Sequence, residues 1–380
     1  MIPIAVNEPI LSGREKEYLI ECINSGWISS EGPYVKELEL LLAKRVNREY
    51  GIAVANGSGA LDIAVRALEI GKGDEVIMPT FTIISCANAI LNSGATPVLV
   101  DSYIDTWNMN VEQIESKITS KTKAIMVVHI YGLPCDMDPI LNLARKHNLK
   151  IIEDAAELIG QTYKGKPCGS FGDISCFSFY PNKHITTGEG GMLLTNDGRL
   201  AERCRSLRNL CFQEGKRFVH EEMGWNYRMT NLQAALGVAQ IERLDEFVQK
   251  KYFIGNFYHQ LLSDVSSDAK IIQLPAPEKE YAKNIYWVFG IVINGEFNAS
   301  DVMKKLSARK IGTRPFFYPM HLQPVFKKMG LFSNSNEQYP VAEMLAEKGF
   351  YIPSGLSLNE EKMQIVVKNL KEVLNECRNG

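Results

Sequence analysis

One lysine has the setting of a reactive amine. Lys183 lies in SCFSFYPNKHITTGEGGML, residues 175–193, where it follows an apolar run on a turn rich in Ser, Thr and Gly. A lysine that attacks a carbonyl must spend part of its time neutral, and partial burial favours the neutral amine. The segment therefore predicts a lysine that forms an imine. A surface lysine in a loop between two strands is the alternative on this segment alone.

Carboxylates end a strand that lies upstream of this lysine. The run KIIEDAAELIG, residues 150–160, predicts a buried strand ending in Glu153 and Asp154, with Glu157 one turn later. An acidic group at the carboxyl end of a parallel strand can pair with a protonated ring nitrogen of a cofactor and strengthen the ring as an electron sink. The simpler alternative is a carboxylate that caps a following helix.

A turn of small residues completes the set. AVANGSGALDIAVRAL, residues 53–68, predicts a strand, an Asn-Gly-Ser-Gly turn and an amphipathic helix. Backbone N–H groups at such a helix start can point at a phosphate, and Ser58 adds a donor. Many such turns bind nothing, and this one is neither a Walker A loop nor GxGxxG. Together with a strand-end Asp and a later Lys, however, it supplies the parts of a pyridoxal phosphate (PLP) site in order.

Long segments of the chain resemble the DegT/DnrJ/EryC1/StrS family of sugar-nucleotide aminotransferases. They are SGWISSEGPYV, NGSGALDIA, GDEVIMPTFT, VVHIYGLPCDMDPI, IIEDAAE, FSFYPNKHITTGEGGML and GWNYRMTNLQAALGVAQIERLDE. The likeness runs from about residue 4 past RPFFYPMHLQPVF. It implies the fold type I architecture: a large α/β domain with a mixed, mostly parallel seven-stranded sheet that binds PLP, and a smaller C-terminal α+β domain.

The resemblance also implies roles for single residues. Lys183 is expected to bond to PLP and act as general acid and base, and Asp154 to pair with the pyridine nitrogen. Asn226 is expected to reach the cofactor phosphate of a neighbouring subunit, which implies a homodimer with shared active sites. The other expected cofactor contacts are Glu157 at the ring hydroxyl, Ser58, Gly59 and Ser178 at the phosphate, and Ile83 and Ala156 on the two ring faces. Relatives often carry an aromatic ring at the position of Ile83.

The residues expected to face the substrate come from several loops, and packing roles are the alternative for each. They are Trp27, Ser29, Ser30, His184, Arg228, Arg314, Tyr318 and His321. A branch of the family that removes the 3-hydroxyl of the sugar carries His at the position of the cofactor lysine. Because this chain carries Lys183 there, with His184 only beside it, the resemblance implies transamination.

The expected reaction moves an amino group from L-glutamate to a nucleotide-linked 4-keto-6-deoxyhexose. SGWISS, VVHIYGLPCDMDPI and NKHITTGEGGM most resemble the members that convert GDP-4-keto-6-deoxymannose to GDP-perosamine, for O-antigen or other surface glycans. A dTDP- or UDP-linked sugar and amination at C3 stay open. Two other classes also stay open. One is a PLP-binding regulatory protein without turnover. The other is a nicotinamide-dependent dehydrogenase, which should carry a GxGxxG turn.

Composition sets further bounds. The chain has 380 residues, 45% of them hydrophobic, which predicts more than one domain; a composition shift near residues 247–253 divides it into 1–250 and 251–380. A net charge of −2 gives no field for nucleic acid or an anionic membrane. The eight Cys show no metal-binding spacing and read as reduced thiols, and no run reaches the roughly 18 apolar residues of a membrane span. We therefore expect a cytoplasmic protein without a structural metal.

Apolar runs alternate with helical patterns along most of the first 200 residues. The runs lie at about 51–56, 74–79, 96–101, 124–131, 150–155, 174–180 and 190–195. This alternation predicts an α/β domain with a largely parallel sheet. Only a short loop joins the last two runs, so we expect an antiparallel or mixed element around Lys183.

Overall fold

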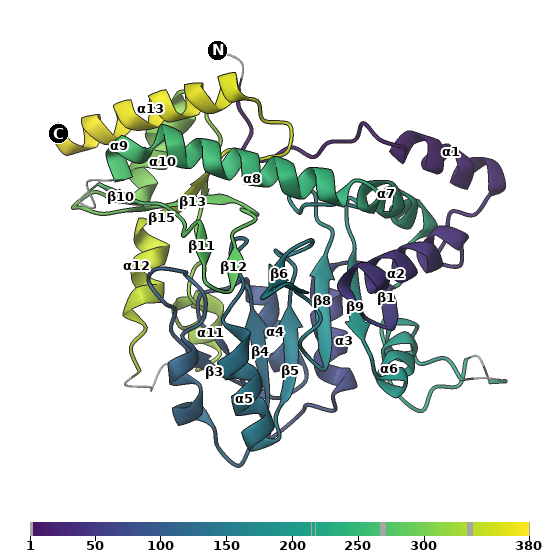
Figure 1. Ribbon diagram of the computed structural model, residues 1–380. Coiled ribbons are helices and arrows are strands. Elements are labelled where there is room, and N and C mark those ends of the chain that lie inside the picture. The colour runs from purple at the N-terminus through teal and green to yellow at the C-terminus, as the bar shows by residue number, and fades with distance from the viewer. Residues whose placement is uncertain (1–2, 214, 217, 267–270, 333–336, 380) are drawn as a thin grey trace.

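The computed structural model describes residues 3–213, 215–216, 218–266, 271–332 and 337–379 (Figure 1). All seven predicted strands are present in one sheet, each within two residues or so of its expected start. They are β1 (Tyr50–Val54), β2 (Glu75–Pro79), β3 (Thr96–Val100), β4 (Thr122–Val128), β5 (Lys150–Asp154), β8 (Ile174–Ser178) and β9 (Gly191–Thr195).

The strand order in this sheet is β1-β9-β8-β5-β4-β2-β3. Neighbours from β8 to β3 pair in parallel, whereas β9 is antiparallel to both β8 and β1. The expected antiparallel element around Lys183 is thus confirmed. Because every strand except β9 runs in the same direction, their carboxyl ends meet at one edge, where α/β folds place their binding sites.

Helices cover both faces of the sheet, so neighbouring strand residues enter different buried clusters. Val76 and Met78 pack in the cluster beneath α3 (Gly57–Ala67) and α4 (Ile84–Asn92), whereas Ile77 packs in the cluster beneath α2 (Pro33–Val46). Burial on both faces explains why these strands read as nearly continuous apolar runs. The remaining helices of this part are α1 (Glu15–Ser25), α5 (Met137–His147) and α6 (Gly198–Arg208).

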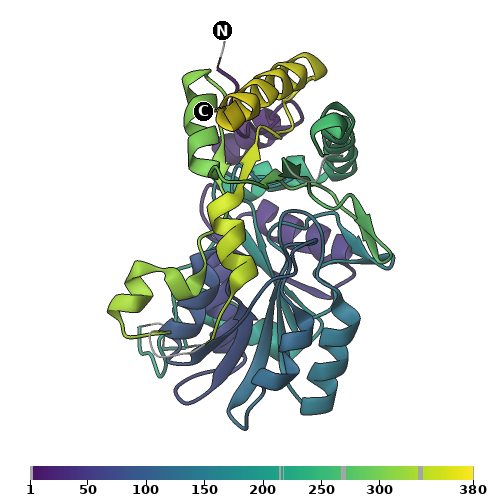
Figure 2. The same ribbon diagram turned by 90° about the vertical axis from the view of Figure 1, so that its left-hand side faces the viewer.

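A second, four-stranded sheet lies in the C-terminal part, in the order β10-β13-β15-β14 (Figure 2). Its antiparallel strands are β10 (Ile272–Gln273), β13 (Phe289–Ile293), β14 (Arg314–Pro315) and β15 (Gly349–Ile352). The helices of this part are α9 (Ser263–Ser266), α10 (Ala299–Ala308), α11 (Pro324–Lys328), α12 (Pro340–Lys348) and α13 (Glu360–Asn379). Two hairpins, β6–β7 (Thr162–Tyr163, Lys166–Pro167) and β11–β12 (Glu278–Lys279, Ala282–Lys283), lie outside both sheets.

Two helices, α7 (Asn231–Ile241) and α8 (Leu244–Leu261), lie between the two sheets in the sequence. The expected boundary at 247–253 falls inside α8, which runs on from α7 toward the second sheet (Figure 1). The N-terminal segment also joins the C-terminal part, since Ile4 pairs with Ile311. Division of the chain at residue 250 stays a prediction. Within the described ranges, none of the helices has the length and apolar character needed to cross a membrane.

Candidate active site

A cleft of about 400 Å³ opens at the carboxyl edge of the main sheet. Strand ends and helix starts line it together with the C-terminal part of the chain. Seven of the expected cofactor contacts line this cleft: Ser58, Ile83, Asp154, Ala156, Glu157, Ser178 and Lys183.

Lys183 lies deep in this cleft, with a side chain that is only 10% exposed. Its Nζ is 3.8 Å from Oε1 of Glu157 and 3.9 Å from the ring centroid of Trp287. Burial lowers the pKa of Lys183, while the carboxylates of Glu157 and Asp154 oppose that shift. Burial likewise raises the pKa of Glu157 to about 7. Burial thus favours the neutral form of both groups, while their mutual attraction opposes it.

Asp154 ends β5 and is nearly buried. One carboxylate oxygen accepts from the backbone N–H of Ala156 at 3.0 Å, and the other accepts from the thiol of Cys86 at 3.3 Å. Burial raises the pKa of Asp154, and these two donors oppose that shift. Turns rather than a helix follow β5, so the capping role considered for this carboxylate has no helix to serve.

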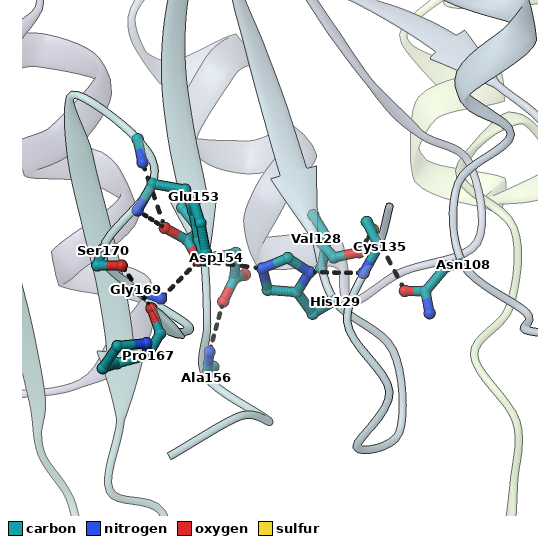
Figure 3. Close-up of polar contacts among 12 residues, drawn as sticks. Asn108, Val128, His129, Cys135, Glu153, Asp154, Ala156, Pro167, Gly169 and Ser170 are labelled. Carbon is teal, nitrogen blue, oxygen red and sulfur yellow. Dashed lines mark hydrogen bonds and ion pairs between the residues drawn. The ribbon is translucent and has the colours of Figure 1, made fainter. Parts of the chain in front are cut away.

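The neighbouring carboxylate, Glu153, points away into a buried polar network (Figure 3). It accepts from the backbone N–H groups of the 169–172 turn and contacts Nε2 of His129 at 3.2 Å. The other ring nitrogen of His129 lies 3.1 Å from the backbone N–H of Cys135, which can only donate. His129 therefore carries its proton on Nε2, and it lines the cleft beside Asp154.

The start of α3 faces the end of β8 across a narrow gap. A Cβ added to Gly57 would come within 2.8 Å of the Cβ of Ser178, so only glycine lets the two elements approach this closely. The hydroxyl of Ser58 is 2.8 Å from that of Ser85, which also lines the cleft. Gly59 does not line the cleft. Its N–H donates to the side chain of Asn56, which caps the helix.

This donor set fits PLP. The cleft offers a buried amine for the aldehyde in Lys183 and a buried carboxylate for the pyridine nitrogen in Asp154. The hydroxyl group of Ser58 at the N-terminus of α3, and that of Ser178 at the end of β8, match the phosphate.

Three of the residues expected to face the substrate come from the segment after α1. Trp27 and Ser29 are exposed and do not line the cleft. Ser30 lines a second cavity of about 610 Å³ together with Arg228, whose guanidinium donates to Asn209. Asn226 is exposed on the strand-like segment beside that cavity and does not reach the cleft of its own chain.

The C-terminal candidates lie at or beyond the cleft rim. Arg314 pairs with Tyr351, which lines the cleft, and Tyr318 is half exposed. Both ring nitrogens of His321 are engaged, one by Thr80 at 2.8 Å and the other by Glu343 at 3.1 Å.

His184 is buried and does not line the cleft. Its Nε2 lies 3.4 Å from the carbonyl oxygen of Ile285, and burial lowers its pKa to about 3. A neutral ring packed behind the lysine loop matches the packing alternative for this residue.

Several residues that line the cleft were missed from the sequence: His129, Tyr180, Asn182, Trp287, Phe317 and Tyr351. Phe317 belongs to the RPFFYPMH segment that was singled out for its neighbours. For Trp287, which lies more than 100 residues from Lys183 in sequence, no local pattern marked a role.

Comparisons with known proteins identify the family of this chain. The model of the DegT/DnrJ/EryC1/StrS aminotransferase family matches residues 9–371. A GDP-perosamine synthase of Escherichia coli O157:H7 is 43% identical over 369 residues, 97% of this chain and 98% of that protein. A GDP-perosamine synthase of Caulobacter vibrioides is 41% identical over 374 residues, 98% of each chain.

A solved structure shares the fold as well. The aminotransferase from Psychrobacter cryohalolentis superposes with a TM-score of 0.90 at 30% identity, covering 98% of this chain and 99% of that one. The fold type I architecture is therefore confirmed. The chain belongs to the DegT/DnrJ/EryC1/StrS aminotransferase family and is a PLP-dependent sugar aminotransferase.

Proposed function

We propose that this enzyme transfers an amino group from L-glutamate to C4 of GDP-4-keto-6-deoxymannose, which yields GDP-perosamine. The observation that carries this proposal is similarity over almost the full length to proteins named GDP-perosamine synthase, at 43% and 41% identity. The cleft supplies the amine and the carboxylates that transamination needs.

Three side chains carry the chemistry in this proposal. Lys183 removes the proton from Cα of the amino donor and later delivers a proton to C4 of the sugar, because burial keeps a share of its amine neutral. Bound PLP supplies the electron sink for both half reactions. Asp154 holds a proton on the pyridine nitrogen, and the carboxylate of Glu157, 3.8 Å from the Lys183 amine, favours the charged form of that amine.

A homodimer is part of the proposal. Asn226 is exposed and points to no partner in its own cleft, which supports a role in a neighbouring subunit. Described residues between α6 and α7 project from the main body (Figure 1). Among them, Phe218 is 82% and Met223 86% exposed. Apolar exposure of this size on a projecting segment suits a subunit interface.

We also propose that the amino sugar is destined for O-antigen or another surface glycan, and that the enzyme works in the cytoplasm. The names of the related synthases support the first part, since perosamine is a sugar product. The spacing of the eight cysteines, which favours reduced thiols, supports the second.

An absorbance experiment tests the reaction. The purified PLP-loaded protein should show a band near roughly 400 nm that shifts toward about 330 nm when L-glutamate is added. GDP-, dTDP- and UDP-linked 4-keto-6-deoxy sugars are then added separately, and only the GDP sugar should restore the first band. Restoration by another sugar would replace the nucleotide in the proposal. No response to glutamate would point to a different donor or to the regulatory class.

A further inference from the structure

Trp287 contacts both Lys183 and the residue before it. The face of its indole lies 3.9 Å from the lysine Nζ, measured to the ring centroid. Its Nε1–H donates to the carbonyl oxygen of Asn182, the residue just before the lysine, at 2.8 Å. That carbonyl also accepts from the side chain of Asn7. The indole therefore holds both the amine and the loop that carries it.

The indole is itself held from behind. Its backbone carbonyl accepts from Nζ of Lys251, a fully buried lysine of α8 that also donates to Ser354, both at 2.7 Å. The ring packs against Tyr131 at 5.8 Å between centroids, and Trp287 is only 4% exposed. A ring with fixed backbone and neighbours cannot swing away from Lys183 without disturbing the core.

Several titratable groups face Lys183. Glu157 and Asp154 approach from β5 and the turn after it, the Cys86 thiol from α4, and the neutral His184 ring follows the lysine in the chain. The carboxylates favour the charged amine and burial opposes it. Aromatic faces attract ammonium groups more strongly than neutral amines. The indole therefore favours the charged form of Lys183, as the two carboxylates do, but it carries no charge itself.

We propose that Trp287 is a positioning residue for Lys183. Its indole holds the amine against Glu157 and sets the pH at which Lys183 becomes reactive toward a carbonyl. The proposal rests on the proposed role of Lys183 as the cofactor lysine. It gives a positioning role to one of the residues by which the C-terminal part of the chain lines the cleft.

The test measures the capture of PLP by apoprotein as a function of pH. The absorbance band near roughly 400 nm reports the captured PLP. Capture requires a neutral amine, so its pH midpoint reports Lys183 directly, without turnover. Trp287→Leu should move the midpoint down by about half a pH unit to one pH unit, because the ammonium loses its aromatic partner. Trp287→Phe keeps a ring face and should move it by less.

Trp107→Leu is the matched control. Trp107 is also buried and packs against Tyr131, at 6.2 Å, but lies outside the cleft. The Trp107→Leu substitution should lower thermal stability and leave the pH midpoint of PLP capture unchanged.

The outcomes separate the two proposals. If wild-type apoprotein captures no PLP, the role of Lys183 itself is wrong. If it does capture PLP, and folded Trp287→Leu and Trp287→Phe keep the wild-type midpoint, only the role of Trp287 is overturned. An equal shift in the Trp107 variant would likewise overturn it, since a general loosening of the core would then explain the effect.

Discussion

Asp154 shows how much one side chain depends on its immediate donors. The backbone N–H of Ala156 and the thiol of Cys86 each hold one carboxylate oxygen, so the group has little freedom to turn. Two donors to the charged form also offset part of the cost of burial. An oriented carboxylate at this position can hold a proton on a ring nitrogen at a defined place.

Replacing this carboxylate by an amide should separate binding from chemistry. Asp154→Asn keeps the size of the side chain, so the protein should still take up PLP, but it cannot hold the pyridinium proton. We expect the half reaction with glutamate to slow by about 100-fold or more in single-turnover measurements. Cys86→Ser, which keeps a donor to the same oxygen, should slow it only a few-fold. A rate in Asp154→Asn close to wild type would remove the proposed role.

At the scale of elements, the start of α3 and the end of β8 lie close together, and we propose that they bind the cofactor phosphate. Removal of one hydroxyl donor to a charged ligand typically costs about 1.5–3 kcal/mol. Ser178→Ala should therefore raise the dissociation constant for PLP about tenfold or more in equilibrium titrations of apoprotein. Ser116→Ala, an exposed serine outside the cleft, is the control. Equal affinities in the two variants would place the phosphate elsewhere.

Helix α8 contributes an unusual group in Lys251. Burial lowers the pKa of Lys251 to about 7, from a model-peptide value of 10.5. Between those two values the unfolded chain binds a proton there and the folded chain does not, so stability rises with pH across this window. Below about pH 7 both states are protonated, and the full cost of the buried charge remains.

Lys251→Met should reveal this dependence. The free energy of unfolding of wild type, minus that of the variant, should rise by about 1 kcal/mol per pH unit from pH 7 toward 10. Urea unfolding at pH 7, 8 and 9 measures the difference. Lys250→Met, at a partly exposed neighbour on the same helix, is the control. A flat difference for Lys251→Met, or the same slope in the control, would mean that a lowered pKa of Lys251 is not the cause.

For the whole molecule, the central question is whether two subunits share each active site. Lys183→Ala and Asn226→Ala should each be inactive or strongly impaired alone. In a mixed dimer, one site combines an intact lysine with an intact asparagine from its partner. After unfolding and refolding together in equal amounts, the two variants should recover about a quarter of wild-type activity, because half the dimers are mixed and half their sites are intact.

Light scattering provides the companion measurement. The wild-type protein should have the mass of a dimer. The Met223→Asp substitution, between α6 and α7, should shift the measured mass toward that of a monomer. Recovery of no activity on mixing, from variants that both form dimers, would confine Asn226 to a role within its own subunit.

The amino-acid sequence by itself determined the seven strands, the antiparallel strand after Lys183 and the core of the cleft. Ser58, Asp154 and Lys183 were found because each follows an apolar run at a strand end, a local pattern that also dictates direction and burial. The segments around them were distinctive enough to identify the family. Only the tertiary structure decided what surrounds them.

Trp287 and Tyr351 reach the cleft because a second sheet packs beside the first one, and long-range packing leaves no local signature. The same packing engages both nitrogens of His321. Contacts within the first 230 residues place Ser30 and Arg228 in a separate cavity. Helix α8 continues through residues 247–253, where composition alone marked a boundary. Contacts between residues far apart in the chain are sums of many weak interactions, so composition and periodicity do not report them.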